Sequence, residues 1–541
     1  MLAKVFSSAL VGIDAIQVDV EVDIAQGLPQ FATVGLPDGA VKESKDRVRS
    51  ALKNAGYEFP QRKITVNLAP ADVKKEGAAF DLPIAVGILA ATGVVQEGRL
   101  KDYLLMGELS LDGGVKPVRG CLSVAVAARR GGYRGIVVPV ENAGEGAVVE
   151  GLDVIAVREL AEAVEFLNGS REIAPHGVDL QELFLSSCDL GDDFAEVKGQ
   201  EHAKRALEVA AAGAHNLLML GPPGSGKTML ARRIPSILPR MSFDEAIETT
   251  KVYSVMGLLE GDRALVATRP FRSPHHTISD IGLIGGGTTP KPGEVSLSHN
   301  GVLFLDELPE FKKNVLEVLR QPLEDGRVTI SRSLLSLTYP SRMMLVAAMN
   351  PCKCGYSGDP LHQCSCTPHD IHRYRSRISG PLLDRIDIHI EVPAVKYREL
   401  SDRADAEPSA EIARRVEASR AIQQERFRGT KVHCNAQMSP RHIKRFCEPD
   451  AAGHRMLELV TDRLGLSARS YTRILKVART IADLEGTENI REQHIARRFS
   501  TGAWTGNRAK FYFCSQYRSS SLTAALKISA KPARLQGCQI A

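Results

Sequence analysis

The sequence predicts a multidomain α/β protein, and three observations support this fold class. The chain has 541 residues, which at about 150 residues per domain corresponds to three or four domains. Short β-like runs alternate with helical stretches in residues 1–170, and apolar strands lead into polar loops and helices in residues 196–393, as in a parallel sheet with helical crossovers. Residues 394–496 are charged and mostly helical.

The composition is that of a globular protein, with 25% charged and 43% hydrophobic residues, and it excludes collagen, coiled-coil rods and wholly disordered chains. No apolar run approaches the about 20 residues of a membrane span. The N-terminus reaches Asp14 without the apolar region of a signal peptide, so we expect a cytoplasmic protein with no membrane partner. There, ten cysteines indicate reduced thiols or a metal site rather than disulfides.

Three stretches predict regular structure in residues 1–170. Apolar and polar residues alternate with period two over residues 15–24, which predicts an amphipathic strand. Residues 81–93 predict a buried helix, and residues 135–140 predict a buried strand. Residues 171–195 lack clear periodicity and contain Pro and Gly, so we expect a linker there.

An apolar strand at residues 216–220 runs directly into a glycine-rich loop and then a helix-like stretch. The loop matches the phosphate-binding pattern GxxxxGK(S/T) in the strand–loop–helix context that the pattern requires. Glycines let backbone N–H groups turn toward phosphate, and the helix N-terminus adds a favourable field. Lys227 would neutralise the β- and γ-phosphates of ATP, and the Thr228 hydroxyl would bind Mg²⁺. The predicted nucleotide-binding residues are Gly221, Pro222, Pro223, Gly224, Ser225, Gly226, Lys227 and Thr228.

Two carboxylates follow a second apolar strand, at residues 302–305. Ligands of open parallel sheets bind at the carboxyl ends of strands, which is where Asp306 and Glu307 would lie. Asp306 would hold the water shell of Mg²⁺, and Glu307 would polarise the attacking water, as phosphoryl transfer to water requires.

Two further polar residues are candidates for the same site. Asn350 follows a third strand at residues 343–349 and would orient water, although asparagine at a strand end is also a common turn former. Arg385, within residues 381–387, would act as an arginine finger in a neighbouring subunit's site. A single arginine is usually a surface charge, so the local sequence by itself does not favour the finger.

Four of the ten cysteines gather just after Asn350, as Cys352-x-Cys354 and Cys364-x-Cys366. Four thiolates suit a closed tetrahedral structural Zn²⁺ site, but the single intervening residue is tighter than the usual two to four. Ordinary reduced cysteines are the alternative, and His362, His369 and His372 are substitute ligands. The adjacent pair His275-His276 is a weaker metal candidate, and we expect its segment to form a loop.

The net charge of +5 points to an acidic partner such as nucleic acid, but its distribution matters more. Residues 497–541 contain eight Lys and Arg and no Asp or Glu, so the rest of the chain has 61 basic residues against 64 acidic ones. Any DNA contact must then come from local basic loops. A hairpin expected at residues 329–338 is one candidate surface, and the basic candidates are Lys291, Arg332, Arg342, Arg373 and Arg375.

Long motifs in one order give the chain a family resemblance. They are VGLPDGAVKESKDRVRSAL, FRSPHHTIS, GEVSLSHNGVLFLDELPEF, AAMNPCKCGY, RYRSRISGPLLDRIDIHIEVP and LSARSYTRILKVARTIADL. From residue 1 to about 496 the chain resembles the ComM (YifB) family of magnesium-chelatase-like AAA+ ATPases. The resemblance implies an αβα ATPase core at 196–393 with a cysteine insertion, and a helical lid at 394–496.

The same resemblance implies roles for individual residues. Lys227 and Thr228 would contact nucleotide, Asp306 and Glu307 would form the Walker B pair, and Asn350 would be sensor 1. Arg385 would be the finger in trans, and Arg469 would be sensor 2, with Arg473 as its competitor. The family is similar to hexameric motors that migrate branched DNA in recombination and natural transformation. Expected partners are therefore a homo-hexamer, branched or single-stranded DNA and recombination proteins.

Residues 70–81 and 107–142 resemble the Lon protease domain, which implies an S5-type α+β fold for residues 1–170. Lon-type proteolysis uses a serine activated by a lysine. The serine position falls on Ala79 and the lysine position near Leu122. Since neither side chain can do this chemistry, we expect a Lon-like domain without peptidase activity.

The end of the chain departs from the family. Relatives carry an acidic helical ending similar to AEAIQYR, whereas Arg497 and Arg498 follow Ala496 here. Inserting one G after a codon for Ala496 turns a permitted coding string for the next residues into Glu-Ala-Ile-Gln-Tyr-Arg. We therefore interpret residues 497–541 as the product of a one-base frameshift, with a genuine basic DNA-binding tail as the alternative. Resequencing the locus decides between them.

Together these observations predict an ATP-hydrolysing ring motor that drives branch migration of recombination intermediates. One alternative is a chelatase-like remodeller that acts on protein or cofactor. Another is a DNA-binding scaffold without motor activity.

Overall fold

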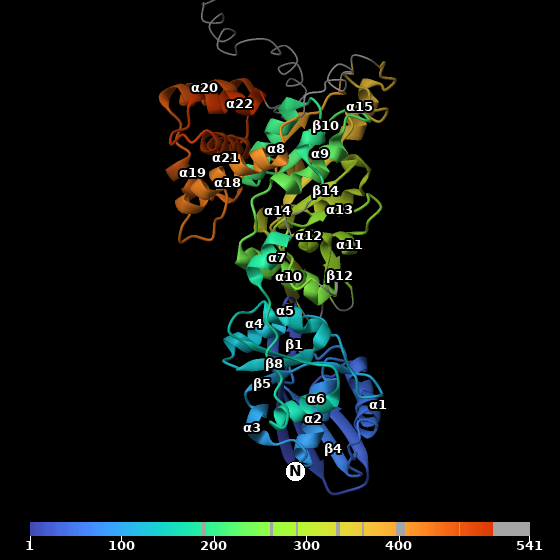
Figure 1. Cartoon of the computed structure of the whole chain (residues 1–541). Helices are drawn as coiled ribbons and strands as arrows, with labels where there is room; N and C mark the ends of the chain where they lie inside the picture. The colour runs from blue at the N-terminus through green and yellow to red at the C-terminus, as the bar shows by residue number, and fades with distance from the viewer. Residues whose placement is uncertain are drawn as a thin grey trace, which may run out of the picture.

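The computed structural model describes residues 1–186, 191–259, 263–287, 290–331, 336–359, 362–395, 406–464 and 466–500, and only the backbone of residues 181, 185, 186, 463, 464 and 497–500. The molecule is elongated (Figure 1). An N-terminal domain lies at one end, an α/β core follows it, and a bundle of helices lies beside the core. Among the described residues, no helix combines the length and the apolar composition that a membrane crossing requires.

The N-terminal domain is built on a seven-stranded mixed sheet with the order β3-β4-β2-β1-β5-β8-β9. The long strands β1 and β2 pair antiparallel, whereas β1, β5, β8 and β9 run parallel. The strands are β1 (Leu2–Val11), β2 (Asp14–Ala25), β3 (Gln30–Val34), β4 (Lys63–Ala69), β5 (Tyr103–Leu105), β8 (Gly135–Pro139) and β9 (Asp153–Val157), with a separate small pair, β6 (Glu108–Leu109) and β7 (Val115–Lys116).

Helices cover this sheet because their apolar faces need burial. They are α1 (Gly39–Asn54), α2 (Asp81–Ala91), α3 (Glu97–Leu100), α4 (Cys121–Arg130), α5 (Ala143–Ala147) and α6 (Leu160–Leu167). Helix α2 packs on β1 and β2 and is buried along nearly all its length, as its apolar sequence predicts. The predicted strands at 15–24 and 135–140 are confirmed as β2 and β8.

The structure describes both positions at which the sequence predicts the missing serine and lysine of a Lon-type dyad. Ala79 lies in the turn before α2, and Leu122 is fully buried in the first turn of α4. The backbone N–H of Leu122 donates to the Glu145 carboxylate at 2.8 Å. The Leu122 side chain packs in a cluster that the N-terminal domain shares with the core.

The segment that the sequence predicts as a linker, residues 171–195, contains a helix, α7 (Leu180–Ser186). Asp179 accepts a hydrogen bond from the N–H of Glu182 at 3.2 Å and so caps its start. Leu180, Leu183 and Phe184 share one face and pack against a cluster to which both the N-terminal domain and the core contribute. The three apolar residues are too few to give a periodic signal, so the helix depends on this tertiary contact.

The core is a five-stranded sheet whose neighbours are all parallel, in the order β11-β14-β17-β10-β18. The strands are β10 (Leu217–Leu220), β11 (Phe271–Arg272), β14 (Val302–Leu305), β17 (Met344–Met349) and β18 (Ile388–Glu391). The strands predicted at 216–220, 302–305 and 343–349 are confirmed. Apolar side chains of both sheet faces are buried in two clusters, which is why these strands read as continuous apolar runs.

Helices and short hairpins surround the core sheet. The helices are α8 (Glu201–Gly213), α9 (Lys227–Arg233), α10 (Phe243–Met256), α11 (Asp280–Ile284), α12 (Glu294–Leu297), α13 (Lys313–Glu317), α14 (Arg320–Asp325), α15 (Pro368–Arg375) and α16 (Gly380–Leu383). The hairpins join β12 (Gly285–Gly286) to β13 (Lys291–Pro292) and β15 (Arg327–Ser331) to β16 (Ser336–Pro340). The hairpin expected at residues 329–338 is therefore confirmed, with Thr329 opposite Thr338.

The last part of the described chain is helical, as predicted. It contains α18 (Ser409–Arg426), α19 (Pro440–Phe446), α20 (Ala451–Leu464), α21 (Ala468–Leu484) and α22 (Glu492–Ser500). Helices α18 and α21 pack on α8 of the core. His215, buried at the end of α8, joins the two parts: its ring nitrogens lie 3.3 Å from Asp387 Oδ2 and 2.8 Å from Thr480 Oγ1.

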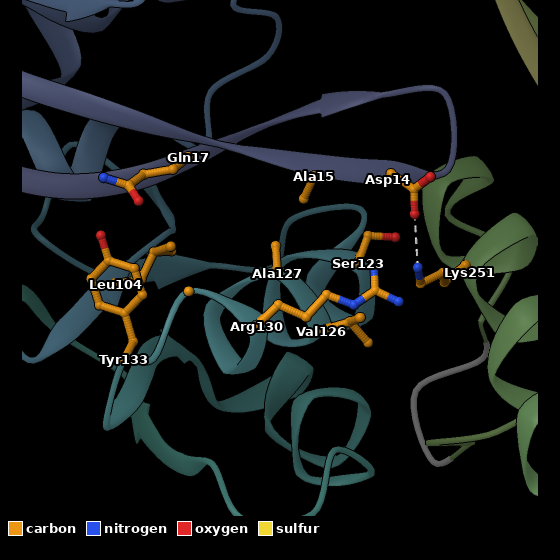
Figure 2. Close-up of a pocket in the computed structure, with 11 residues that line it drawn as sticks. Asp14, Ala15, Gln17, Leu104, Ser123, Val126, Ala127, Arg130, Tyr133 and Lys251 are labelled. Carbon is orange, nitrogen blue, oxygen red and sulfur yellow. Dashed lines mark hydrogen bonds and ion pairs between the residues drawn. The ribbon is translucent and has the colours of Figure 1, made fainter.

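The N-terminal domain contacts the core through helix α10. Lys251 Nζ donates to Asp14 Oδ1 at 2.8 Å, and the Ser254 hydroxyl donates to the buried Glu145 carboxylate. Burial raises the pKa of Glu145, although Ser254 and the N–H of Leu122 oppose the rise. A cavity of about 240 Å³ lies at this junction. Figure 2 shows the Asp14–Lys251 pair at one end of it and Tyr133 at the other.

Candidate nucleotide-binding site

The carboxyl ends of β10, β14 and β17 meet at one edge of the core sheet. Leu220 pairs with Met349, and Leu305 pairs with Ala347, so the residues that follow these strands are neighbours in space. Ligands bind at this edge of open parallel sheets. The topology therefore brings together Lys227, Thr228, Asp306, Glu307 and Asn350, which the sequence singled out separately.

Lys227 begins α9 and is buried, with 8% of the residue exposed. Its ammonium group donates to the carbonyls of Gly221 and Pro222, each at 2.8 Å, and lies 3.3 Å from Asn350 Oδ1. Burial lowers the pKa of Lys227, and the Asp306 charge opposes that shift. The lysine and Asn350 are thus already held beside each other at the strand ends.

The start of the phosphate loop has no room for a side chain. A Cβ on Gly221 would come within 2.1 Å of the carbonyl oxygen of Val392, which follows β18. Gln200 supports the loop from the other side, since its amide donates to the Ser225 carbonyl at 2.7 Å and to that of Pro393 at 3.2 Å. Sequence reasoning missed Gln200, because the only local signal is its position just before a helix.

Thr228 and Asp306, which the sequence predicts as magnesium ligands, contact each other. The Thr228 hydroxyl donates to Asp306 Oδ2 at 2.6 Å, and Asp306 Oδ1 accepts the N–H of Glu307 at 2.9 Å. Hydroxyl and carboxylate oxygens are ligands that Mg²⁺ prefers. The two oxygens lie next to the glycine-rich loop and would hold a magnesium ion there.

Glu307 has an unusual backbone, with φ of 50° in the left-handed region. A non-glycine residue in this region carries strain, and such strain is concentrated at functional sites. The side chain is half exposed, and its Oε2 lies 3.4 Å from Nδ1 of His276. His276 also packs edge-on against Phe311, with ring centroids 6.4 Å apart.

His276 is the second functional residue that sequence reasoning missed. The sequence suggested only a loop or a weak metal candidate for His275-His276, because their distance from Glu307 along the chain hides the contact. The signal that would have found it is topological: His276 follows β11, and β11 pairs with β14, which leads to Glu307. In the part of the chain that the structure describes, His275 and His276 belong to no metal-ligating cluster.

The three arginine candidates lie apart from Lys227. Arg385 forms an ion pair with Glu324 and donates to the Pro381 carbonyl at 2.8 Å. The pKa of Glu324 is lowered by the hydrogen bond and the charge of Arg385 and, more weakly, by the charges of Arg469 and Arg320. Arg469, whose charge also acts on Glu324, is exposed. Arg473 instead donates to the carbonyl of Ile386 at 2.7 Å.

The four cysteine side chains converge as predicted. All four Sγ atoms lie within 4.8 Å of one another, and Cys352 is fully buried. The backbone N–H of Tyr356 and the Cys352 thiol lower the pKa of Cys354 to about 5. The pKa of Cys364 rises to about 12: the N–H of Cys366 opposes the rise, but burial and the two neighbouring sulfurs outweigh it. One thiolate thus forms readily, but several thiolates this close together repel one another and need a bound cation. This arrangement suits Zn²⁺.

The structure also places the predicted DNA-contacting residues. Lys291, Arg342 and Arg373 are exposed, and Arg332 lies outside the described residues. Arg375 is half-buried and donates to the Pro351 carbonyl at 2.9 Å, so it holds the chain that follows Asn350. The histidines offered as substitute zinc ligands are not part of the four-cysteine cluster.

Three family models match most of the described chain. The model for magnesium chelatase, subunit ChlI, matches residues 193–400, and the one for its C-terminal part matches residues 406–500. A third, for subunit ChlI of Mg-chelatase, matches residues 20–142.

Individual relatives extend this likeness. The chain is similar to competence protein ComM of Haemophilus influenzae, with 45% identity over 92% of this chain and 96% of the relative. It is also similar to protein YifB of Escherichia coli, with 44% identity over 91% of this chain and 96% of the relative. The magnesium-chelatase 38 kDa subunit of Rhodobacter capsulatus is 24% identical over 56% of this chain and 84% of its own length.

Proposed function

Because the chain belongs to the ComM/YifB family, whose members carry magnesium-chelatase ChlI-like domains, we propose that it is an ATP-hydrolysing DNA motor. It would form a hexameric ring and promote branch migration of recombination intermediates. The observation that carries this proposal is the convergence of Lys227, Thr228, Asp306, Glu307 and Asn350 at the carboxyl edge of the core sheet.

In the proposed reaction, each side chain has one task. The Lys227 ammonium would move from the loop carbonyls to the phosphate oxygens. Thr228 and Asp306 would hold Mg²⁺, which supplies positive charge against the phosphates. Asn350 would position the attacking water, and the Glu307 carboxylate would accept its proton.

The positions of the arginines support ring assembly. Arg385 and Arg469 lie near the same carboxylate, Glu324, and are not among the contacts of Lys227. A head-to-tail contact would bring them to the nucleotide of the next subunit, and such contacts close into a ring when the rotation per subunit allows. Arg469 would then act together with Arg385.

DNA, and through it recombination proteins, are the partners we propose. The competence name of the Haemophilus influenzae relative supports a role in DNA handling. The described cysteines are all free thiols, which supports a cytoplasmic location and a structural Zn²⁺ at Cys352, Cys354, Cys364 and Cys366. Residues 1–170 would be a Lon-like domain without peptidase activity.

A chelatase-like remodeller of protein or cofactor is the second candidate, favoured by the similarity to the magnesium-chelatase subunit. The deciding experiment measures ATP turnover with and without branched DNA, together with movement of a synthetic four-way junction. Lys227→Ala and Glu307→Gln serve as controls. We expect DNA to stimulate turnover and the junction to migrate only with the unsubstituted protein. Turnover that DNA leaves unchanged, without junction movement, would favour the remodeller.

A further inference from the structure

The chain that follows Asn350 returns to the phosphate loop. Asn350 contacts Lys227, and residues 351–358, here called the cysteine turn, come directly after it. In this turn the N–H of Gly355 donates to the Cys352 carbonyl at 3.0 Å, and the N–H of Ser357 donates to Cys352 Sγ at 3.3 Å. The turn is thereby folded around the buried Cys352.

Gly355 is the point at which this turn meets the nucleotide site. It is buried, and a Cβ on it would lie 2.5 Å from Cδ and 2.7 Å from Cγ of Pro223 in the phosphate loop. Its φ of 90° also lies in the region that favours glycine. The Gly355 backbone therefore packs directly against the Pro223 ring.

The cysteine cluster holds the turn in this position. Cys352 Sγ lies 3.3 Å from Cys354 Sγ and 3.7 Å from Cys364 Sγ, and Cys354 Sγ lies 3.5 Å from Cys364 Sγ. Cys352 and Cys354 flank the short path to Gly355, so a metal bound by the four sulfurs would fix the turn as well as the loop that brings Cys364 and Cys366. On its other side, Arg375 holds the Pro351 carbonyl.

We propose that the cysteine turn is a structural part of the nucleotide site, in which Gly355 supports Pro223 and the metal-bound cysteines keep Gly355 in place. Nucleotide affinity then depends on a glycine outside the phosphate loop and on the metal content of the cluster. The proposal rests on the proposed nucleotide binding but requires neither hydrolysis nor DNA.

The test compares two glycines of the same turn. Gly358 has a similar φ of 85°, but a Cβ on it meets nothing within 4 Å. Gly355→Ala and Gly358→Ala therefore share the backbone cost and differ in the contact with Pro223. With a fluorescent ADP analogue, we expect Gly355→Ala to weaken binding about tenfold and Gly358→Ala to leave it nearly unchanged. Equal affinities of the two variants would overturn the proposal.

A second substitution separates this contact from misfolding. Pro223→Ala removes the Cγ and Cδ atoms that the new methyl group would strike. In a protein that already carries Pro223→Ala, Gly355→Ala should therefore weaken binding less than it does in the unsubstituted protein. Losses that simply add in the double variant would contradict a direct contact. Thermal unfolding curves of all variants show whether each one folds.

The metal is tested with Cys364→Ser in the full chain. We expect elemental analysis to find about one Zn²⁺ per unsubstituted chain, and less zinc together with several-fold weaker ADP binding in the variant. Zinc loss with unchanged affinity, or no zinc in the unsubstituted protein, would overturn the role of the metal. The analogue also tests the premise, because failure of the unsubstituted protein to bind it would contradict the proposed function itself.

Discussion

Glu307 is the residue on which the proposed chemistry depends most. Its backbone lies in the left-handed region, and its N–H donates to Asp306, so the two carboxylates leave the strand in different directions. Asp306 turns toward Thr228, whereas Glu307 lies beside His276. Two adjacent residues of the same charge therefore have different surroundings, which suits one to magnesium and the other to water.

The first prediction concerns Glu307→Gln. The amide keeps the shape of the side chain but accepts no proton from water, so we expect ATP turnover to fall at least about 100-fold. Nucleotide binding should change little, because Lys227 and Thr228 are intact. Turnover assays and binding of a fluorescent nucleotide measure the two effects separately. Activity close to that of the unsubstituted protein would remove Glu307 from the proposed mechanism.

The second prediction concerns His276 as a positioning residue for Glu307. His276→Ala should lower kcat about tenfold with little change in KM, because a displaced base slows the chemical step and not binding. His275→Ala is the comparison variant: His275 contacts Thr277 and lies against the His276 ring, with centroids 4.1 Å apart, but does not contact Glu307, so it should lower kcat less than His276→Ala. His276→Asn, which keeps a polar side chain, should recover part of the rate. Equal effects of the two alanine variants would contradict the assignment.

At the scale of elements, His215 joins α8, the start of β18 and the C-terminal helix α21. Its ring is fully buried between Asp387 and Thr480. Burial alone would raise the pKa of Asp387, but the hydrogen bond and charge of His215, with the charges of Lys476 and Arg473, bring it below its ordinary value of 3.8. The carboxylate is thus stabilised in its charged form where the core sheet meets the C-terminal helices.

The third prediction follows from the direction of this pKa shift. Since the pKa of Asp387 is lower in the folded state, its contribution to stability is complete above pH 3.8 and is lost as pH falls through the lowered value. Asp387→Asn should therefore lower the free energy of unfolding by about 2 kcal/mol at pH 7. Urea titrations of both proteins at pH 7 and at pH 3 measure this. An unchanged difference at pH 3 would contradict the charge-based explanation.

At the scale of the whole molecule, the proposed site is complete only in an assembly. Arg385 is held by Glu324, and Arg469 lies near that same carboxylate. Within one chain, neither arginine is among the contacts of Lys227. A head-to-tail neighbour would be needed to bring an arginine to the nucleotide site.

The fourth prediction mixes two inactive variants. Arg385→Ala lacks the finger and Glu307→Gln lacks the base, so each ring alone should hydrolyse ATP very slowly. In rings assembled from equal amounts, about a quarter of the interfaces combine an intact Glu307 with an intact Arg385. We expect the mixture to hydrolyse ATP at about a quarter of the rate of the unsubstituted protein. A mixture no more active than its components would contradict action in trans.

Most elements and the nucleotide residues could be predicted from local sequence. Strands β10, β14 and β17 are apolar runs of the expected length. A glycine-rich motif that contains Lys227 follows β10, and the polar residues Asp306 and Asn350 follow β14 and β17. Helix α7 was not predicted, and its segment was expected to be a linker. Its few apolar residues are buried only where the N-terminal domain contacts the core. Gln200 and His276 were not predicted either, because their partners Ser225, Pro393 and Glu307 lie far from them along the chain.

What the sequence by itself determined is therefore the set of candidate groups: a glycine-rich loop, a carboxylate pair, an asparagine after a strand and a cluster of thiols. Each group can be recognised from a short stretch of sequence, because the conformation of a loop and the end of a strand depend on neighbouring residues. What only the tertiary structure decided is which of these groups touch. Strand β11 beside β14 sets His276 against Glu307, and the turn around Cys352 sets Gly355 against Pro223. Such contacts join residues far apart in the chain, and their partners are chosen by strand order and packing.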